Sequence, residues 1–515
     1  MRFLSLARKL KNGRIVGKGN PDLTGIAENS KQTHSGELFV CLPGAKVDGR
    51  VYAEEAVRSG ARAVVAQEQP LKGLAVPQLV VKDSREALAR LAHLYYGDPS
   101  KKVKVIGVTG TKGKTTTTYL IRSILERAGR PAGLIGTIAY QIGKKTYEAN
   151  NTTPSSLTIV KLLDEMRRQK CGWAVMEVSS HSLEMKRVLG VEFRGAVFTN
   201  LGRDHMDYHK NFTNYFKAKR RLFTEFKSVK ARAVNADDNY GQKLLKELKS
   251  KAVGFGLKAK CAYRAVKVEH RPGFIGFEVQ GRAFEAPLTG LFNIYNSLAA
   301  ISILRELGLP WEVLQDGLKH APAVPGRFEE VVAGQDFTVL VDYAHTPDAL
   351  KQALIASREI LGKKSHHKLI SVFGCGGDRD RTKRPLMGKI SSQLADMTVV
   401  TSDNPRTEKP SAILEDILRG IAYPLLQNGH RRVWVEEDRG AAIRLALSMA
   451  KKGDLVLIAG KGHETYQVIG EEKQHFDDRE VAREILKDLL PPSPAAPQRR
   501  VSGQDAKNGK RQNAQ

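Results

Sequence analysis

The stretch from Val103 to Leu125 constrains the fold of this chain more than any other. An apolar, β-branched run ends in a turn that contains Gly107, Gly110 and Gly113, and a run of threonines then opens a segment with helical apolar spacing. This order predicts a buried strand, a phosphate-binding loop and a helix, as in a P-loop-type ATPase sheet.

The predicted loop has the residue types that bind a nucleoside triphosphate. Its glycines allow backbone N–H groups and the positive end of the helix to face an anion, Lys114 adds a charge, and the Thr115 hydroxyl is placed to ligate Mg²⁺. One position departs from the strict P-loop motif: Val108 stands where the motif has glycine. The nucleotide-binding residues predicted here are Gly110, Thr111, Lys112, Gly113, Lys114, Thr115 and Thr116.

The chain is too long for a single hydrophobic core. Its 515 residues predict about three domains, which we place at residues 1–98, 99–326 and 327–490, with a linker at 98–102. Residues 491–515 contain no aromatic residue and are rich in Pro, Gln, Arg, Asn and Gly. Such a composition cannot bury a core, so we predict a disordered basic tail.

Alternation of apolar runs with helical segments predicts an α/β fold. We expect central strands at residues 103–108, 173–178, 195–201 and 231–235, and C-terminal strands at 337–343, 368–373, 397–402 and 454–458. Short alternating runs between residues 263 and 288 predict an antiparallel appendage. The expected architecture is therefore a small N-terminal α/β unit, a central ATPase sheet and a C-terminal doubly wound, Rossmann-like sheet.

Charge and hydropathy narrow the choice of partners. The net charge of +28 is spread over the body of the chain and suits either acidic substrates or nucleic acid. Because aromatic residues are not interleaved with the basic ones, we expect no nucleic-acid partner. No apolar run approaches the roughly 18 residues of a membrane span, and the N-terminus has no cleavage site. We therefore expect a cytoplasmic protein, with its four scattered cysteines reduced.

Two polar clusters follow predicted strands of the central unit. Glu177 ends the strand at 173–178, where a carboxylate could complete a Mg²⁺ shell begun by Thr115. The alternative is a helix N-cap cluster that includes Ser179. The next strand is followed by NLGRDHMDYHK, in which we choose His205 as the functional member, although such a cluster can also be a solvated loop.

Four polar loops follow the predicted strands of the third unit, namely DYAHTPDAL, GCGGDRDRTKRPLM, TSDNPRTEKP and AGKGHETYQ. Arg379, Arg384, Arg406 and Lys461 lie in them. A guanidinium group binds carboxylates and phosphates through two parallel hydrogen bonds. The four loops together therefore predict a binding site for such anions at the strand ends.

The motifs TGTKGKTTT, NTTPSS, EVSSHSLEMKRV, TNLGRDHMDYH, YFKAK, PGRFE, DYAHTPDAL, GCGGDRD, DNPR and GKGHE together resemble those of the Mur ligases. The resemblance covers residues 20–485 and is strongest to the branch that adds meso-diaminopimelate. It implies a cytoplasmic bacterial enzyme of peptidoglycan precursor synthesis that uses ATP and Mg²⁺; we also expect a monomer. ATP would phosphorylate the D-glutamate side-chain carboxylate of UDP-MurNAc-L-Ala-D-Glu, and an amine of the diamino acid would then displace the phosphate.

The resemblance also implies a role for each residue that matches a family motif. Lys114 and Thr115 would hold phosphates and Mg²⁺, Glu177 and His205 would serve the metals, and Lys219 would be carbamylated and so become an anionic metal ligand. The expected contacts are Ser30, Thr152, Thr153, Ser179, Arg187 and Lys219 for the muramoyl substrate, Asn296, Arg327 and His345 for the nucleotide, and Arg379, Asp403, Asn404, Pro405, Arg406, Gly460 and Glu464 for the diamino acid.

Two places depart from the family pattern. The family's Asp-Ser-Arg is Asn29-Ser30-Lys31 here, which leaves the contacts beside Ser30 open, and Met185 stands where a glutamine often holds the substrate.

Three other functions remain open at this stage. The same ligase reaction could use L-lysine, although Arg406 favours a substrate with one more carboxylate. A folylpolyglutamate-type ligase shares the acyl-phosphate chemistry, but the DNPR motif and the N-terminal unit argue against it. A nucleic-acid-dependent NTPase is suggested by net charge alone.

Overall fold

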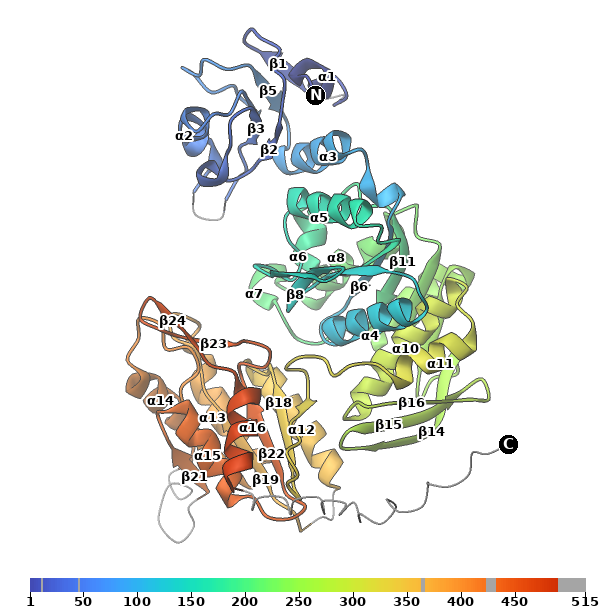
Figure 1. Ribbon diagram of the computed structural model, residues 1–515, viewed down its shortest axis with the longest axis vertical. Coiled ribbons are helices and arrows are strands. Elements are labelled where there is room, and N and C mark those ends of the chain that lie inside the picture. Colours follow the sequence, from blue (N-terminus) through green and yellow to red (C-terminus); the bar gives the residue numbers. More distant parts are fainter. Residues whose placement is uncertain (11–12, 45–46, 363–365, 423–431, 490–515) are drawn as a thin grey trace, which may run out of the picture.

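Three α/β units follow one another along the chain (Figure 1). The computed structural model describes residues 1–10, 13–44, 47–362, 366–422 and 432–489, so the predicted tail at 491–515 lies outside the described residues. The N-terminal and C-terminal units lie on opposite sides of the central one. Among the described residues, no helix has the length and apolar character needed to cross a membrane.

The N-terminal unit contains a five-stranded sheet in the order β1-β5-β4-β3-β2, parallel except where β1 pairs with β5. Its elements are α1 (Phe3–Ala7), β1 (Arg14–Val16), β2 (Gly25–Ala27), η1 (Ser30–Gln32), β3 (Glu37–Val40), η2 (Gly49–Tyr52), α2 (Ala53–Arg58), β4 (Ala63–Gln67), β5 (Gln78–Val81) and α3 (Ser84–Tyr96). The core around Leu38, Val65 and Leu91 extends to Leu157 and Val160 of the central unit, so the two units share packing.

The segment that we expected to be a linker is a packed joint. Pro99–Lys101 form a single 3-10 turn, η3, in which Pro99 and Ser100 are buried. The Ser100 hydroxyl oxygen accepts a hydrogen bond from the Glu192 backbone N–H at 3.1 Å. The joint therefore fixes where the strand of the phosphate loop begins.

The central unit contains an eleven-stranded sheet in the order β16-β15-β14-β13-β12-β11-β6-β10-β7-β8-β9. Its strands are β6 (Lys104–Thr109), β7 (Ala132–Ile135), β8 (Ala139–Ile142), β9 (Lys145–Glu148), β10 (Trp173–Glu177), β11 (Phe193–Phe198), β12 (Ala231–Asn235), β13 (Val253–Gly256), β14 (Tyr263–Arg271), β15 (Phe274–Val279) and β16 (Arg282–Ala286). The four predicted strands and the antiparallel appendage are confirmed, and β14 joins the appendage to the parallel sheet by pairing with β13.

Helices cover both faces of the central sheet. Side chains alternate along a strand, so Ile106 and Val108 pack with α4, α10 and α11 on one face, and Val105 packs with α5, α8 and α9 on the other. The helices and short turns are α4 (Lys114–Arg127), α5 (Ser156–Arg168), α6 (Ser180–Glu184), α7 (Met206–His209), α8 (Phe212–Thr224), α9 (Asn239–Leu248), η4 (Lys249–Lys251), α10 (Leu291–Glu306) and α11 (Trp311–Lys319). Burial on both faces explains why β6 is an almost continuous apolar run.

The C-terminal unit is doubly wound, as predicted, around a six-stranded sheet in the order β17-β18-β22-β19-β20-β21. Its elements are β17 (Glu329–Glu330), β18 (Thr338–Asp342), α12 (Pro347–Leu361), β19 (Leu369–Phe373), α13 (Lys383–Leu394), β20 (Met397–Val400), α14 (Pro410–Leu418), β21 (Val433–Val435), α15 (Arg439–Met449), β22 (Leu455–Ala459), β23 (Tyr466–Ile469), β24 (Glu472–His475) and α16 (Asp478–Leu489). Helices α12, α13 and α14 cover one face, and α15 and α16 cover the other. The β23–β24 hairpin is an addition that we did not predict.

Candidate active site

The phosphate loop lies between the end of β6 and the start of α4, as predicted. Gly110 and Gly113 have positive φ values of 155° and 82°. A Cβ atom on Gly110 would collide with the Thr199 hydroxyl, and one on Gly113 would collide with the Asn296 side-chain oxygen. Glycine is therefore required at both positions, and Asn296 packs directly against the loop.

Two residues after β11 hold the loop in place, and our sequence prediction missed both. The Lys112 N–H donates to Asn200 Oδ1 at 2.9 Å, and the Asn200 side-chain amide donates back to the Lys112 carbonyl at 3.1 Å. The Thr199 hydroxyl donates to the same carbonyl at 2.6 Å. Both residues belong to the TNLG segment, in which polar residues directly follow an apolar strand. This pattern could have identified them as loop-binding residues.

Lys114 and Lys219 converge on one acceptor. Lys114 Nζ donates to the carbonyl oxygens of Gly110 at 3.0 Å and Thr111 at 2.9 Å, and Lys219 Nζ, from α8, donates to Gly110 at 2.8 Å. Burial, followed by the nearby Lys114 charge, places the pKa of Lys219 well below its usual value. Burial also lowers the pKa of Lys114. Both lysines are thus held beside the phosphate loop.

The predicted metal ligands Thr115 and Glu177 are both buried. Glu177, at the end of β10, accepts from the Thr137 N–H at 2.8 Å, and its other oxygen is 3.1 Å from the Thr137 hydroxyl. That hydroxyl is also 3.1 Å from Thr152 Oγ1, so Thr137 connects Glu177 to a predicted substrate residue. We did not predict Thr137, which lies in an apolar segment without a motif of its own.

His205 stands in a left-handed backbone conformation with φ of 53° and packs edge-on against His181 at 4.8 Å between ring centroids. Partial burial lowers the pKa of the His205 imidazole and favours its neutral form, which can accept a metal ion. Within the described residues, no three His, Cys, Asp or Glu side chains are already gathered as a metal site. The predicted set of metal ligands therefore depends on the Thr115 hydroxyl and on Lys219 in addition to Glu177 and His205.

The residues predicted for the muramoyl substrate lie mostly around the end of β10. The Thr153 hydroxyl donates to the Glu177 carbonyl at 2.8 Å and accepts from the Ser179 N–H at 3.1 Å, while Arg187 donates to the Thr153 carbonyl at 2.9 Å. Ser30 is buried in η1 of the N-terminal unit. Met185, the departure from the family pattern, lies 3.5 Å from Arg187 through its sulfur atom.

Residues predicted for the nucleotide flank the phosphate loop from two units. Arg327 lies over the Tyr343 ring at 4.8 Å, and its Nε atom is buried without a hydrogen-bond partner among the described residues. His345 donates from Nδ1 to the Tyr343 carbonyl at 2.8 Å, because a carbonyl oxygen can only accept. Lys112 Nζ donates to the Asp348 carbonyl at 3.2 Å and so joins the loop to the start of α12.

Loops after β19, β20 and β22 bring together most residues predicted for the diamino acid. Asn404 donates to Glu464 at 2.9 Å, and Arg406 donates to the Gly377 carbonyl at 2.8 Å. A Cβ atom on Gly460 would lie 2.6 Å from Asp403 Oδ2, so these two loops touch. The residues that remain are Arg379, exposed and donating to the Asp378 carbonyl at 3.2 Å, and Pro405, whose carbonyl packs against Gly377.

Two of the cations that we expected to bind anions in this unit have internal partners instead. Arg384 is fully buried and pairs with Glu408 at 2.7 Å and Asp416 at 3.0 Å. Lys461 is also fully buried and donates to Asn404 Oδ1 at 3.0 Å. The prediction that Arg384 binds a ligand is therefore wrong, because both of its Nη atoms are held by carboxylates inside the fold and its remaining Nε atom is buried.

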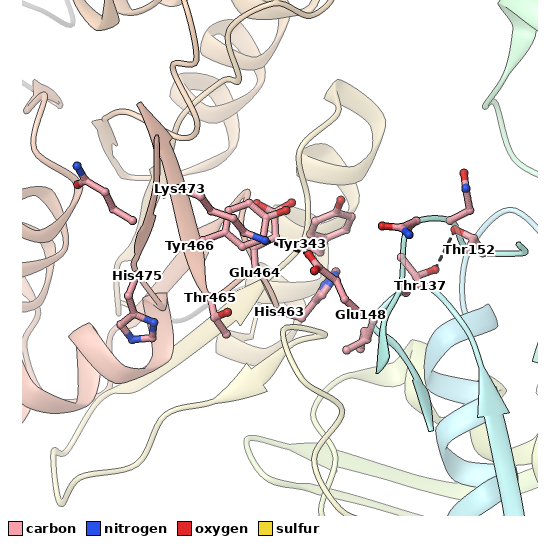
Figure 2. Close-up of a pocket in the computed structure, with 15 residues that line it drawn as sticks. Thr137, Glu148, Thr152, Tyr343, His463, Glu464, Thr465, Tyr466, Lys473 and His475 are labelled. Carbon is pink, nitrogen blue, oxygen red and sulfur yellow. Dashed lines mark hydrogen bonds and ion pairs between the residues drawn. The ribbon is translucent and has the colours of Figure 1, made fainter. Parts of the chain in front are cut away.

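One cavity of about 720 Å³ lies between the central and C-terminal units. Figure 2 shows Thr137, Thr152 and Glu148 on one side of it, and Tyr343, His463 and the segment from Glu464 to Tyr466 on the other. Lys473 of β24 spans the two sides through an ion pair with Glu148 at 2.9 Å. A residue predicted for the muramoyl substrate, Thr152, thus lines the same cavity as Glu464, predicted for the diamino acid.

Family models match each of the three units. "Mur ligase family, catalytic domain" matches residues 22–96, "Mur ligase middle domain" matches residues 108–304, and "Mur ligase, glutamate ligase domain" matches residues 326–462.

Curated relatives match nearly the whole chain. A protein of Clostridium botulinum is 42% identical over 496 residues, covering 94% of this chain and 100% of its own length, and one of Geobacter sulfurreducens is 44% identical over 502 residues, covering 94% and 98%. Both are described as UDP-N-acetylmuramoyl-L-alanyl-D-glutamate–2,6-diaminopimelate ligase.

Solved structures give the same answer for the fold. A structure of a ligase with that same description is 32% identical, with a TM-score of 0.65, and the match covers 91% of this chain and 95% of the other. Folylpolyglutamate synthase of Mycobacterium tuberculosis, 16% identical, shares the fold with a TM-score of 0.57 over 79% of this chain and 96% of its own. From the matches to family models and relatives over nearly its whole length, the chain belongs to the Mur ligase family of enzymes.

Proposed function

We propose that this protein is an ATP-dependent ligase that adds meso-2,6-diaminopimelate to the D-glutamate side-chain carboxylate of UDP-MurNAc-L-Ala-D-Glu, a step of peptidoglycan precursor synthesis in the bacterial cytoplasm. The observation that carries the proposal is the cavity that Thr152 and Glu464 line together. The names of relatives more than 40% identical over nearly the full length support the choice of substrates.

ATP is the substrate for which the phosphate loop is suited. The loop N–H groups and Lys114 would take the β- and γ-phosphates, so that Lys114 exchanges its two carbonyl acceptors for phosphate oxygens. The buried, unpartnered Nε atom of Arg327 fits a nucleotide on the other side of the loop. A carboxylate oxygen of the D-glutamate then attacks the γ-phosphorus, ADP leaves, and an acyl phosphate forms.

Magnesium fits the side chains gathered near Lys114. Thr115, Glu177 and His205 would hold it, and the buried Glu177 and Thr115 supply the hard oxygen atoms that this ion prefers. When bound, the ion neutralises phosphate charge. Thr137, through its two contacts to Glu177, keeps that carboxylate oriented.

Lys219 is suited to carbamylation, in which its neutral amine attacks CO₂ and loses a proton to give an anionic carbamate. Only the neutral amine is nucleophilic, and burial beside Lys114 favours that form. The carbamate would place a negative charge between Lys114 and the metal ligands. We propose it as a further Mg²⁺ ligand and a contact of the muramoyl substrate.

The diamino acid would bind between the three loops of the C-terminal unit and present its amine to the acyl phosphate. The amine attacks the carbonyl carbon, phosphate leaves with the electrons of the broken C–O bond, and a proton is released. Arg406 would bind the carboxylate that lysine lacks, while Glu464 would pair with the neighbouring ammonium. Asp403, Asn404 and Gly460 would complete the site, with Arg379 at its edge.

The domain boundaries that we propose are 1–98, 99–326 and 327–490. We also propose a monomer, because every residue of the proposed site comes from this one chain. The residues of the proposed site are accounted for without a nucleic-acid partner.

Phosphate release is the experiment that tests the proposal. The unmodified enzyme is expected to release phosphate from ATP only when UDP-MurNAc-L-Ala-D-Glu and meso-diaminopimelate are both present, with one tripeptide nucleotide formed for each phosphate. Lys114→Ala is expected to be inactive, and Lys102→Ala, an exposed lysine before β6, is the control. Stimulation of phosphate release by dihydrofolate, DNA or RNA in place of the muramoyl nucleotide would contradict it.

A further inference from the structure

Lys461 occupies an unusual place just after β22. Its neighbours Gly460 and Gly462 have positive φ values of 121° and 54°. A Cβ atom on Gly460 would lie 2.6 Å from an Asp403 side-chain oxygen, and one on Gly462 would lie 2.7 Å from the Tyr343 backbone. The two glycines thus let the chain pass between two loops and turn the Lys461 side chain inward, where none of it is exposed.

The buried ammonium of Lys461 fixes the orientation of the Asn404 amide. Asn404 Oδ1 accepts from Lys461 Nζ at 3.0 Å and from the Val468 N–H at 3.0 Å. Because two donors point at this oxygen, the amide cannot turn its NH₂ group toward them. The Nδ2 atom therefore faces the other way and donates to Glu464 Oε2 at 2.9 Å.

Lys461 also lies close enough to the Glu464 carboxylate to offset its negative charge. Its Nζ atom is 3.7 Å from Glu464 Oε2. The nearby buried cation, Arg439, already forms a two-bond pair with Asp478. Burial and the Asp403 charge hold the pKa of Glu464 above its usual value, and the Lys461 charge, the Asn404 hydrogen bond and the Arg406 charge oppose that shift. Removal of Lys461 would therefore favour the neutral, protonated form of Glu464.

We propose that Lys461 is a positioning residue for the amino-acid substrate, and that it acts through Asn404 and Glu464 without touching the substrate. The inference rests on the proposed function, which gives these two side chains to the diamino acid. Lys461 sets the Asn404 amide with its NH₂ group toward the site and places a positive charge 3.7 Å from Glu464, which favours the carboxylate form that would meet an ammonium.

Lys461→Met is the test variant, because methionine keeps most of the length of the buried chain and removes the donor and the charge. We expect the KM for meso-diaminopimelate to rise about 10- to 100-fold, the range for losing a hydrogen bond that involves a charged group. The KM values for ATP and the muramoyl nucleotide should stay within about twofold. Lys452→Met, an exposed lysine before the same strand, is the matched control and should change nothing.

Two further variants separate positioning from a purely structural role. Lys461→Gln keeps an N–H donor and is expected to recover at least part of the lost affinity. In an Asn404→Ala background, Lys461→Met should raise the KM for the diamino acid by a smaller factor than it does in the unmodified enzyme, because one of the two side chains through which it acts is gone. Full multiplication of the two single effects, or an equal rise in all three KM values, would overturn the proposal.

The amine that the unmodified enzyme accepts is measured first, so that the two proposals can fail separately. If that amine is not meso-diaminopimelate, the proposed function fails, and the same variants are then assayed with the amine that is used. An unchanged KM for that amine in folded Lys461→Met overturns the positioning role whichever amine it is.

Discussion

At the residue scale, the carbonyl oxygen of Gly110 is the point at which two lysines meet. Lys114 and Lys219 both donate to it, and each is desolvated. Two desolvated ammonium groups that share one acceptor repel each other, and the loss of one charge removes that repulsion. Conversion of Lys219 to an anionic carbamate would turn the repulsion into attraction.

Lys219→Ala is expected to lower kcat by at least 100-fold and to recover partly when a small carboxylate such as formate or acetate is supplied, because the added anion can occupy the space of the carbamate. Phosphate release measures the effect. Lys217→Ala, an exposed lysine two residues earlier on α8, is the matched control and should remain active. Full activity of Lys219→Ala would contradict the carbamate role.

Arg406 is the residue that should distinguish diaminopimelate from lysine. Its Nη1 atom donates to the Gly377 carbonyl, and its backbone is tied to the β23–β24 hairpin through the Val468 carbonyl at 3.0 Å. Arg406 therefore braces its loop against the Gly377 carbonyl. A carboxylate would be a stronger partner for the guanidinium group than this carbonyl.

Arg406→Ala is therefore expected to raise the KM for meso-diaminopimelate by roughly 10- to 100-fold, the range for a lost charge-assisted hydrogen bond, with much less effect on the KM for ATP. Initial-rate kinetics with each substrate varied in turn measure both values. Arg419→Ala, an arginine with a mostly exposed side chain at the end of α14, serves as the control. A variant that kept its full preference for meso-diaminopimelate over L-lysine would rule out this role for Arg406.

At the element scale, a buried ion pair anchors two loops of the C-terminal unit. Arg439, at the start of α15, forms two hydrogen bonds of 2.7 Å with Asp478 at the start of α16, and both side chains are fully buried. The same guanidinium group donates to the carbonyls of Ser402 and Ala459 at 3.1 Å. The Ser402 carbonyl follows β20 and the Ala459 carbonyl ends β22. The ion pair therefore fixes the positions of the two site loops that begin there.

Asp478→Ala is expected to lower the unfolding free energy of the C-terminal unit by about 3–5 kcal/mol, because it leaves a buried guanidinium group without its counter-charge. Urea denaturation followed by tryptophan fluorescence measures the change. The control is Asp488→Ala, which removes the exposed pair between Arg444 and Asp488 on the same two helices and should cost at most about 1 kcal/mol. Equal losses in the two variants would contradict the account.

The strongest elements could be predicted from the sequence, whereas contacts across loops could not. β6, β10, β18 and β19 are apolar runs whose burial on both faces follows from composition, and their ends differ from prediction by at most one residue. The β23–β24 hairpin is short and half-exposed, and only Gly470 at its turn, with φ of 60°, marked it. Its pairing gives no apolar period that a single sequence would reveal.

The candidate site shows the same division. The phosphate loop could be predicted because its glycines and Lys114 are local in sequence. Thr137 and Asn200 were missed because their roles arise only when distant segments meet. Arg384 was misassigned for the same reason, since its partners Glu408 and Asp416 lie on another loop and helix.

At the scale of the whole molecule, the central and C-terminal units meet across the cavity. The Glu148–Lys473 pair closes one side, and Lys473 also lies 3.9 Å from the centre of the Tyr466 ring. Lys112 makes a second connection, to the Asp348 carbonyl. Catalysis between substrates held by different units depends on their relative position, so these contacts bear on rate as well as on stability.

Lys473→Glu is expected to lower kcat/KM by roughly two- to fivefold, because an exposed ion pair is worth at most about 1 kcal/mol. The exchange of both charges, in Glu148→Lys with Lys473→Glu, should restore most of the loss. Steady-state kinetics at low salt provide the measurement. The interpretation fails if the double variant is as slow as the single one.

Competition between meso-diaminopimelate and L-lysine for the unmodified enzyme tests the central claim most directly. The two amines are supplied at equal concentration with ATP and UDP-MurNAc-L-Ala-D-Glu, and the products are separated by mass. The account predicts that the diaminopimelate product dominates by at least about 100-fold, because a site built for the extra carboxylate rejects an amine that leaves Arg406 without its partner. A product mixture dominated by L-lysine, or no tripeptide nucleotide with either amine, would contradict it.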